Sequence, residues 1–499
     1  MKRYLFFAVF ILTGAATYAQ TNLNTAADAV RYADDNMNGT ARFRAMSGAF
    51  GALGGDLSAM MVNPAGSAVF NFNSGTISLT SYNIANKSSY FGTDVKTHDN
   101  SFELNQIGAV FVFNNAKENA FINKFTVGFN YENTNNFDNR IFTAGTNPTN
   151  SIDQYFLQYA NGVPLSKLND SYYQNLTYGQ QQAYLGYNAY IFNPDQNAPG
   201  NTSYTSNVPQ NGGYYQENSI NTTGYNGKIA LNFATQLKQR FYVGANLNIH
   251  FTDYVKGYSV YEDYNTSPRT GLQSVRFDNE RYTYGGGFSF NIGAIAKVTE
   301  SLRLGLAYES PTWMNLQDEI RQRIVSDCPD CDNNSGLIIT DPGMTFILDD
   351  YTIQTPSKYT GSLAYVFAQH GLISIDYSFK DYSNTKYTSS RYNSINNELS
   401  STLDIAGELR IGAEYRLKNF SFRGGYRYEQ SPYKNNSTLG ELNGFSGGLG
   451  IAFGNSKVDL AYSYYNRKMD VPILPTAFTD TARINSRNNN ITLSYTLDL

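Results

Sequence analysis

Strict alternation of apolar and polar residues is the dominant pattern of this chain. In the last segment, every second residue from Ile491 to Leu499 is apolar, and the residues between them are polar. Residues 240–256 repeat the pattern, with an alternating series that runs from Phe241 to Phe251. Successive side chains of a β-strand point to opposite faces, so this alternation predicts strands whose two faces meet different surroundings.

Fourteen segments carry this pattern, and the connections between them alternate in length. Short turns such as 238–239 and 454–455 alternate with long segments, above all 133–222. Short turns on one side, long loops on the other and an even strand count are typical of outer-membrane barrels. We therefore predict an all-β fold, a transmembrane antiparallel β-barrel of about 14 strands. The predicted strands are 75–85, 102–114, 121–132, 223–237, 240–256, 281–297, 301–310, 351–367, 371–382, 403–417, 419–430, 441–454, 456–466 and 484–499, with further long loops at 257–280, 311–350, 383–402, 431–440 and 467–483.

The chemistry of the two strand faces favours the same architecture. Lipid cannot hydrogen-bond to backbone groups, so a sheet that spans a membrane has to close on itself. Its outward side chains are apolar within the bilayer and aromatic at the two interfaces. Tyrosines near the strand ends fit such girdles, namely Tyr254, Tyr282, Tyr284, Tyr308, Tyr462 and Tyr464. The alternative is a soluble, secreted β-rich protein, which the consistent placement of charged residues on one face disfavours.

Composition agrees with a barrel and excludes two other classes. The 499 residues include 41 Tyr, 32 Phe and 42 Gly, and only 16% are charged, whereas a typical soluble surface carries about 25–35% charged residues. A mean hydropathy of −0.42 excludes a helical membrane protein. The formal net charge of −4 offers no basic surplus to neutralise phosphates, so nucleic acid is not an expected partner.

The first residues have the pattern of a secretory signal. Lys2 and Arg3 precede the apolar run from Tyr4 to Leu12, and small residues follow up to Ala19. This predicts a signal peptide over 1–19, since the run is too short to span a bilayer. Together with the barrel pattern, it predicts a multi-pass barrel in the outer membrane of a Gram-negative cell.

Residues 20–73 show little alternation, and we predict that they form a hatch, or plug, inside the barrel. The segment from Gly39 to Gly66 is rich in glycine, which permits sharp bends and close packing. It also carries apolar side chains that need to be buried. The barrel is then assigned to residues 74–499.

The long outer loop at 133–222 contains a helical pattern. Ile152, Tyr155, Phe156 and Tyr159 follow helical spacing and would share one face of a short helix. Such a face could pack on the rim of the barrel, or it could capture a hydrophobic ligand. Both interpretations remain open at the level of sequence.

Other candidate chemistry is sparse. Cys328 and Cys331 are close in a polar loop, where an oxidising compartment favours a disulfide between them. Two cysteines cannot form a four-cysteine zinc site, and the three histidines of the chain are too far apart on the strand map to share a metal. The G-x-S-x-G match at 444–448 lies inside a strand rather than at a strand-to-helix turn. We therefore expect no catalytic residues, no metal and no cofactor.

Residues 41–66 carry a resemblance to a known family. This stretch, which ends in Asn63-Pro64-Ala65-Gly66, resembles the N-terminal hatch of the FadL-type outer-membrane transporters, the channels for long-chain fatty acids and aromatic hydrocarbons. Pro64 restricts Asn63 to extended conformations, and Asn63 can bond to neighbouring backbone, so the motif also favours a structural latch. The chain departs from the family in its long polar loop and in ending with Leu499 rather than Phe.

The resemblance implies the passive, hatch-gated uptake of hydrophobic small molecules. It implies capture by the outer loop and release sideways through a defect in the third strand, 121–132, where Gly128 is the candidate gate. The expected partners are the hydrophobic ligand, outer-membrane lipid and lipopolysaccharide, and the protein is expected to be a monomer. The alternative function is that of a plugged adhesin or binding protein that acts through its outer loops. A general porin is disfavoured because porins lack such a plug.

Overall fold

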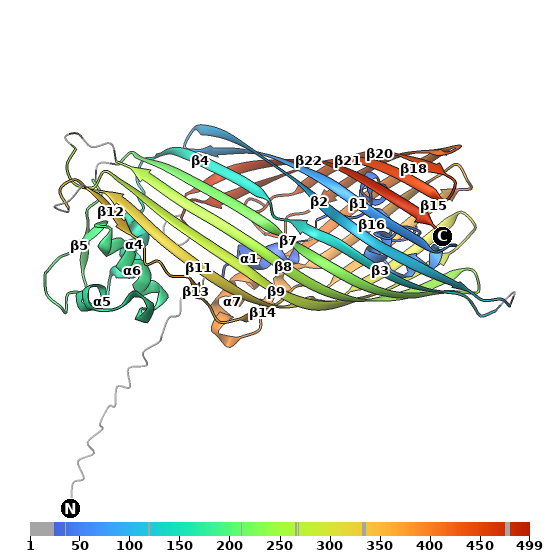
Figure 1. Cartoon of the computed structure of the whole chain (residues 1–499), viewed down its shortest axis with the longest axis horizontal. Coiled ribbons are helices and arrows are strands. Elements are labelled where there is room, and N and C mark those ends of the chain that lie inside the picture. Colours follow the sequence, from blue (N-terminus) through green and yellow to red (C-terminus); the bar gives the residue numbers. More distant parts are fainter. Residues whose placement is uncertain are drawn as a thin grey trace, which may run out of the picture.

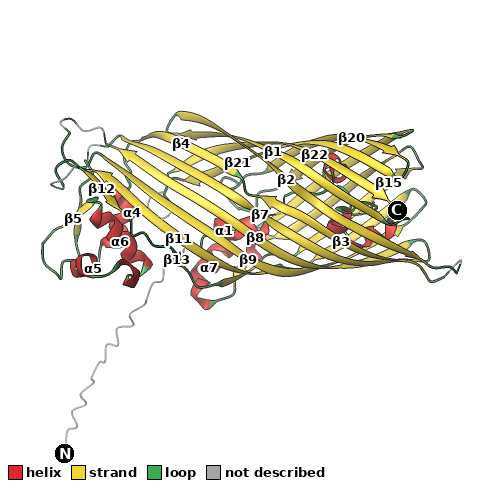
Figure 2. Cartoon of the chain, viewed as in Figure 1, coloured by secondary structure: helices red, strands yellow, loops and turns green. Residues whose placement is uncertain are grey.

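The computed structural model describes residues 24–34, 36–117, 120–210, 212–264, 267, 269–331, 336–474 and 480–499. Their strands form one elongated barrel, with helices in the lumen and a helical segment at one end (Figures 1 and 2). The predicted signal peptide, residues 1–19, lies outside the described residues.

The wall is a closed antiparallel barrel of 14 strands, which confirms the predicted fold class. It closes where the first and last strands pair, from Ser74 opposite Asp498 to Ser89 opposite Arg483. Several wall strands consist of consecutive pieces, such as β3 with β4 and β10 with β11. The strands are β1 (Ser74–Tyr90), β2 (Thr93–Asn114), β3 (Ile122–Asn136), β4 (Asn139–Asn147), β7 (Tyr214–Leu237), β8 (Phe241–Asp263), β9 (Ser274–Lys297), β10 (Leu302–Glu309), β11 (Trp313–Asp327), β12 (Leu337–Thr340), β13 (Phe346–Ile347), β14 (Tyr351–Gln354), β15 (Lys358–Phe367), β16 (Gly371–Asp381), β17 (Lys386–Tyr387), β18 (Ile405–Leu417), β19 (Phe420–Glu429), β20 (Leu442–Phe453), β21 (Ser456–Pro472) and β22 (Thr481–Asp498).

The outward-facing side chains of the wall are apolar only in the half of the barrel on the side of the short turns. On β8, the outward side chains Phe241, Leu247 and Ile249 are exposed, and the outward series turns polar at Asp253. The longest strands, with 23 or 24 residues, exceed the roughly 9–11 residues that a spanning strand needs. The barrel therefore projects well beyond the membrane on the side of the long loops.

This projection explains why several predicted loops are too long. The loops predicted at 257–280 and 467–483 contain the ends of β8, β9, β21 and β22, and two others differ more. The loop predicted at 133–222 is shorter, because β3 and β4 continue to Asn147 and β7 begins at Tyr214. The loop predicted at 311–350 contains β11, whose partner β9 pairs with it from Phe288 opposite Trp313 to Ser274 opposite Asp327. Outside the membrane both faces of a strand can be polar, so these segments lack the alternation that marks the lipid-embedded part.

Two prolines separate pieces of neighbouring wall strands. Pro311 lies between β10 and β11, and Pro356 lies between β14 and β15. Proline cannot donate to the strand ladder, so each strand is interrupted there.

The helices fall into an inner and an outer group (Figure 2). The inner group belongs to the hatch and consists of α1 (Ala26–Ala33), α2 (Ala41–Ala45), α3 (Ala59–Val62) and the 3-10 helix η1 (Pro64–Val69). The outer group consists of α4 (Asp153–Ala160), α5 (Leu165–Asp170), η2 (Tyr173–Asn175), α6 (Tyr178–Asn188), η3 (Tyr382–Asn384), η4 (Ser390–Tyr392) and α7 (Asn393–Thr402), with the small hairpin β5 (Phe192–Pro194) and β6 (Tyr204–Ser206). Across the described ranges, no helix combines the length and the apolar character needed to cross a bilayer.

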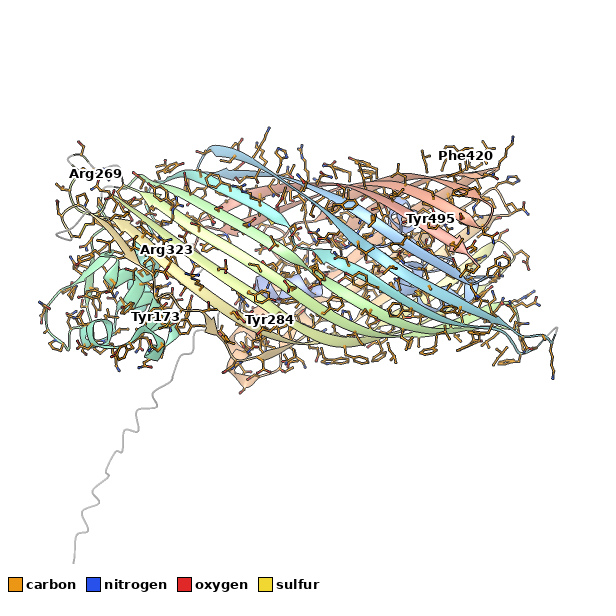
Figure 3. The ribbon with its side chains drawn as sticks, viewed as in Figure 1. Tyr173, Arg269, Tyr284, Arg323, Phe420 and Tyr495 are labelled. Atoms are coloured by element: carbon orange, nitrogen blue, oxygen red, sulfur yellow. A yellow bond between two sulfur atoms is a disulfide. The ribbon has the colours of Figure 1, made fainter. Side chains whose placement is uncertain are left out.

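One predicted interface tyrosine is misassigned. Tyr254 points into the lumen, where only 4% of it is exposed, and the Arg31 guanidinium lies 3.9 Å from the centre of its ring. By contrast, Tyr462 faces outward and is 49% exposed, as a girdle residue should be. Tyr284 and Tyr495, also on the outside of the wall, are labelled in Figure 3.

Candidate functional site

The hatch motif is held in a recess of the wall made by glycines. A Cβ atom at Gly244 of β8 would come within 2.7 Å of the Pro64 carbonyl carbon, and one at Gly293 of β9 would overlap the Asn63 side chain. Ala65 is fully buried beside Tyr242 and Ile295. The hatch backbone therefore approaches the wall more closely than any side chain at these two positions would allow.

Asn63 acts as the latch of this recess. Its Nδ2 donates to the Gly51 carbonyl at 2.7 Å, within the hatch, and to the Ala294 carbonyl of β9 at 3.1 Å. Its Oδ1 accepts from the Ala65 amide at 3.2 Å and so caps the start of η1. The geometry supports the structural role that the sequence suggested for Asn63-Pro64-Ala65-Gly66. Gly66 contributes by packing against Gly54, at which a Cβ would come within 2.7 Å of the Gly66 carbonyl oxygen.

Glycines of the wall allow close approach of the hatch at further positions. A Cβ at Gly412 or Gly425 would collide with the backbone of Met46, at 2.6 Å in each case. Gly448 leaves room for Ala45, and Gly305 leaves room for Gly51. Successive wall strands thus present small residues where the hatch touches them, and the hatch is fitted to the whole inner circumference.

Polar contacts add to this fit. The Arg42 guanidinium pairs with Glu414 of β18 at 3.0 Å, and the Gly51 amide donates to the Asp376 carboxylate of β16 at 2.8 Å. The Ala41 amide donates to Ser494 of β22 at 2.7 Å. Hydrogen bonds to charged groups stabilise by about 1.5–3 kcal/mol when buried, so these contacts hold the hatch from several sides.

Helix α1 lies further out and closes the lumen a second time. Arg281 of β9 bridges Asp28 of α1 and Asp318 of β11, at 3.1 Å and 2.6 Å. At the other end of α1, Arg467 of β21 pairs with Asp34 at 2.9 Å, and the Lys380 ammonium donates to the Ala33 carbonyl at 2.9 Å. The charged lumen face of the wall therefore serves to fix the hatch.

Cavities between hatch and wall are small and polar. One of about 40 Å³ lies between Tyr32 and His250, and another of about 70 Å³ lies between Asn38 and Glu132. Each can hold only a few water molecules. Neither offers an apolar passage through the lumen.

A larger cavity lies at the outer mouth of the barrel. Its volume is about 310 Å³, and the outer-loop segment 173–181, the lumen face of β11, and the segment 344–351 form its walls. The lining is mainly aromatic and aliphatic, and Arg391 and Asp349 pair at its edge at 3.1 Å. The apolar and aromatic lining residues are Tyr173, Leu176, Tyr178, Ile320, Met344, Phe346, Leu348, Tyr351 and Tyr392. Burial raises the pKa of Tyr178 to about 12, so its hydroxyl is neutral at physiological pH.

The residues that sequence reasoning proposed for ligand capture lie elsewhere. Ile152 and Phe156 are fully buried, Tyr155 is 7% exposed, and Tyr155 and Phe156 pack on Phe277 of β9. Tyr159 packs against Tyr155 in the same core. Helix α4 therefore uses its apolar face to fasten the outer loop to the rim, which buries Ile152, Tyr155 and Phe156 and leaves Tyr159 partly exposed. Helical spacing identified an apolar face correctly, but it could not tell which surface covers that face.

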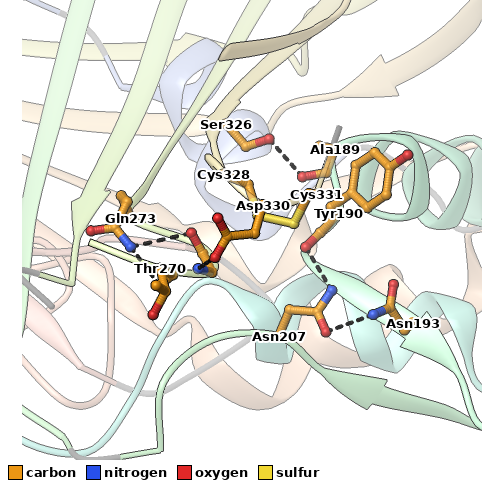
Figure 4. The surroundings of a disulfide bond; sticks show 11 residues. Ala189, Tyr190, Asn193, Asn207, Thr270, Gln273, Ser326, Cys328, Asp330 and Cys331 are labelled. Atoms are coloured by element: carbon orange, nitrogen blue, oxygen red, sulfur yellow. Dashed lines mark hydrogen bonds between the residues drawn. A yellow bond between two sulfur atoms is a disulfide. The ribbon is translucent and has the colours of Figure 1, made fainter. Parts of the chain in front are cut away.

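The predicted disulfide is present. Cys328 and Cys331 are bonded at the tip of the hairpin formed by β11 and β12 (Figure 4). Ser326 donates to the Ala189 carbonyl at 2.6 Å, which ties this hairpin to the end of α6. Cys328 is fully buried in the core of the outer loop. The bond therefore braces this hairpin where it packs against the outer loop.

Replacing Cys328 and Cys331 by serine should loosen this brace without unfolding the barrel. Closing so short a loop contributes about 2 kcal/mol in the chain-entropy treatment. We expect faster protease cleavage within the outer loop, while the heat-stable migration of the folded barrel on gels is retained. Reductant should have the same effect on the native protein. Equal cleavage of both proteins would show that the disulfide does not brace the mouth.

The candidate gate at Gly128 lies in unbroken wall. Gly128 is paired with Val110 of β2 on one side and with Asn232 of β7 on the other. The irregularities of β3 lie near its ends, between Ile122 and Lys124 and between Asn133 and Asn135. A gap in the ladder at Gly128 is therefore not observed, and the prediction for this residue is corrected.

An interruption does occur further out, between β2 and β4. Residues 93–104 of β2 pair with β1 alone among the described strands. A side chain spans the missing pairing, since Thr97 of β2 donates to the Arg140 carbonyl of β4 at 2.7 Å. From the next strand, Ser88 of β1 also reaches β4 and donates to the Phe142 carbonyl at 2.6 Å. We call this boundary, between residues 93–104 and β4, the side-chain seam.

Two solved structures share this architecture. The chain resembles a Pseudomonas aeruginosa FadL homologue over 93% of its length and 99% of that chain, with a TM-score of 0.56 and 13% identity. It resembles the Pseudomonas putida toluene transporter TodX over 94% of its length and 100% of that chain, with a TM-score of 0.51 and 14% identity. No curated protein sequence matches the chain.

The chain is thus a closed β-barrel with the fold of the FadL-type channels, plugged from within. The sequence profile of the BamG family matches residues 201–470, which is more than half of the chain. The protein belongs to the BamG family.

Proposed function

We propose that this protein takes up hydrophobic small molecules across the outer membrane and captures them in the outer cavity. The single observation that carries this proposal is the aromatic cavity of about 310 Å³ at the mouth of a plugged barrel. Its volume is at the lower end of the roughly 300–1,000 Å³ typical of ligand pockets. A small aromatic hydrocarbon, or one part of a long fatty acyl chain, matches that size. The fold shared with a toluene transporter supports the same class of ligand.

Onward movement from the cavity requires a change in the hatch or in the wall. The lumen below the cavity is closed by α1 and by the latched motif, so straight passage needs the hatch to move. The side-chain seam is the alternative exit, because single hydrogen bonds such as Thr97 to Arg140 can break one at a time. A continuous strand ladder would have to break cooperatively. Within this proposal the lateral gate belongs to the seam rather than to Gly128.

Filling the cavity tests the capture step. Met344→Trp should obstruct the cavity and lower the uptake of labelled toluene or fatty acid by at least about tenfold, since a blocked site removes the apolar area that drives binding. Ile347→Trp is the matched control, because Ile347 is 64% exposed and does not line the cavity. The readouts are uptake by cells with and without the protein, and ligand binding to the purified protein. Normal binding and uptake in Met344→Trp would exclude this cavity as the capture site.

A second candidate function is favoured by the closely packed lumen. Ion pairs such as Arg42 with Glu414 fasten the hatch, and the inner cavities are small and polar. A barrel sealed in this way can serve as a rigid base for its outer extension, which then binds a partner. Cells that lack the protein would show unchanged uptake but would lose the partner from the surface. That result would favour a binding protein over a transporter.

A further inference from the structure

A basic patch occupies the outside of the wall beyond the membrane. It consists of Lys87, Lys96, Lys468, Arg483 and Arg487, on the four neighbouring strands β21, β22, β1 and β2. Their side chains are on the outward face, because they are exposed and alternate with less exposed neighbours, and Lys96 is directly opposite the outward-facing Lys87. The strand register brings them together: Lys87 is opposite Lys96 on one side and opposite Asn485 on the other, and Asn485 is opposite Lys468.

The positive charges of this patch are only partly neutralised. Lys87 pairs with Asp94 at 2.8 Å, and Arg483 pairs with Asp470 at 3.2 Å. Glu441, at the start of β20, borders the patch near Lys468. The side chains of Lys96, Lys468 and Arg487 make no hydrogen bond or ion pair with any residue that the structure describes. Asp94 also attracts the charge of Lys96. Five cations thus share the patch with three carboxylates, those of Asp94, Asp470 and Glu441, and a surplus of positive charge remains on this surface.

Repulsion between like-charged neighbours in this patch destabilises the wall unless an anion binds between them. Lys87 and Lys96 are directly opposite each other across two strands, an arrangement that destabilises a sheet. The wall formed by β9 and β11 is arranged differently at its outer end. There Glu280 is opposite Arg321, and Asp278 is opposite Arg323, so opposite charges face each other. The patch is thus a local feature of one side of the barrel and not a property of its whole outer end.

The patch lies next to the lipid-facing band. On β22 the outward side chains are apolar from Leu497 to Ile491, and Asn489 and Arg487 follow in the outward direction. A cation at this height meets the headgroup region of the outer leaflet. That leaflet carries phosphate and carboxylate groups on its glycolipids, and clusters of Lys and Arg at a membrane surface bind such groups.

We propose that the basic patch binds the anionic headgroup of an outer-leaflet glycolipid. Lys96, Lys468 and Arg487 supply the charges for its phosphate or carboxylate groups, and Arg487 is nearest to the bilayer. Bound glycolipid would relieve the repulsion between Lys87 and Lys96. It would also cover the β1–β2 hairpin, which borders the side-chain seam. This inference is independent of what the outer cavity binds.

Glycolipid retention tests the proposal. The variant Lys96→Gln, Lys468→Gln, Arg487→Gln should retain at least about tenfold less lipopolysaccharide than the native protein, since each cation near a charged membrane surface contributes on the order of a factor of five in affinity. Retention is measured by native mass spectrometry of the purified barrel and by titration with purified lipopolysaccharide. Added salt should weaken binding to the native protein, because exposed charges are screened.

Two controls separate this site from general membrane contact. Arg321→Gln, Arg323→Gln removes cations from the charge-paired wall and should leave retention unchanged, while Lys96→Arg, Lys468→Arg, Arg487→Lys keeps the charges and should restore it. Titration with dephosphorylated lipopolysaccharide should show weaker binding to the native protein. Equal retention by the Gln variant would overturn the proposal. Unchanged binding of lipopolysaccharide that lacks both its phosphate and its carboxylate groups would overturn it too, because such binding would depend on sugar or acyl contacts instead.

Discussion

Removal of residues 41–66, with a short Gly-Ser linker in their place, should convert the sealed barrel into an ion-conducting pore. The wall does not depend on this segment for its pairing, since β1 joins β22 along its whole length without it. The segment does fill the lumen, where Asn63, Arg42 and the Gly51 amide bind three different wall strands. In planar bilayers the variant should give stable channels, whereas the intact protein should give none or only brief openings.

The structure also predicts that this opening occurs in two steps. Helix α1 would remain in the outer half of the lumen, held by Arg281 and Arg467. A variant that lacks residues 24–66 should therefore conduct several-fold more current per channel than one that lacks 41–66. Heat-resistant migration on gels would verify that both barrels are folded. Unchanged conductance in both variants would mean that the lumen is closed by something other than the hatch.

The sequence could predict the part of the barrel that lipid constrains. Within the bilayer the outward face must be apolar and the inward face polar, so β8 shows its alternation from Phe241 to Phe251. Beyond the membrane that constraint ends, and β11 has polar residues on both faces, with Asn315 outside and Asp318 inside. The missed strands are therefore those that no longer face lipid.

The candidate site was predictable where function depends on local chain geometry. Asn63 followed by Pro64 favours an extended residue that caps a turn, and the structure uses it in that way. The outer cavity could not be predicted, because its walls come from segments as distant as Asn24 and Tyr392. The aromatic spacing of α4 indicated burial, but the partner Phe277 lies more than a hundred residues away. Tyr254 was misassigned for the same reason, since its partner Arg31 belongs to the hatch.

Substituting Gly293 by alanine should dislodge the latch while leaving the wall intact. A Cβ atom at this position would overlap the buried Asn63 side chain, which is 1% exposed, and would come within 3.0 Å of Pro64 Cδ. Gly293 has no left-handed backbone angle, so alanine itself is tolerated by the strand and the strain is confined to the contact with the hatch. Overpacking of this kind costs about 1–3 kcal/mol, which at 1.4 kcal/mol per factor of ten would raise the population of the undocked hatch between roughly fivefold and roughly a hundredfold.

Gly361→Ala is the matched control for this experiment. Gly361 is on the wall strand β15, and a Cβ there would meet no atom within 4 Å. Both variants should fold with similar heat-resistant migration, but only Gly293→Ala should show frequent openings in bilayers and faster hydrogen exchange of the hatch amides. Adding Asn63→Gly to Gly293→Ala would separate the clash from a general weakening of β9. If the new methyl group displaces the Asn63 side chain, removing that side chain allows residue 63 to return to its native position. The double variant still lacks the hydrogen bond from Asn63 to the Ala294 carbonyl. The double variant should therefore fall between the native protein and Gly293→Ala. If Gly293→Ala opens no more often than the native protein in bilayers, the hatch adjusts to the added methyl group. The glycine recess is then not what holds the hatch in place.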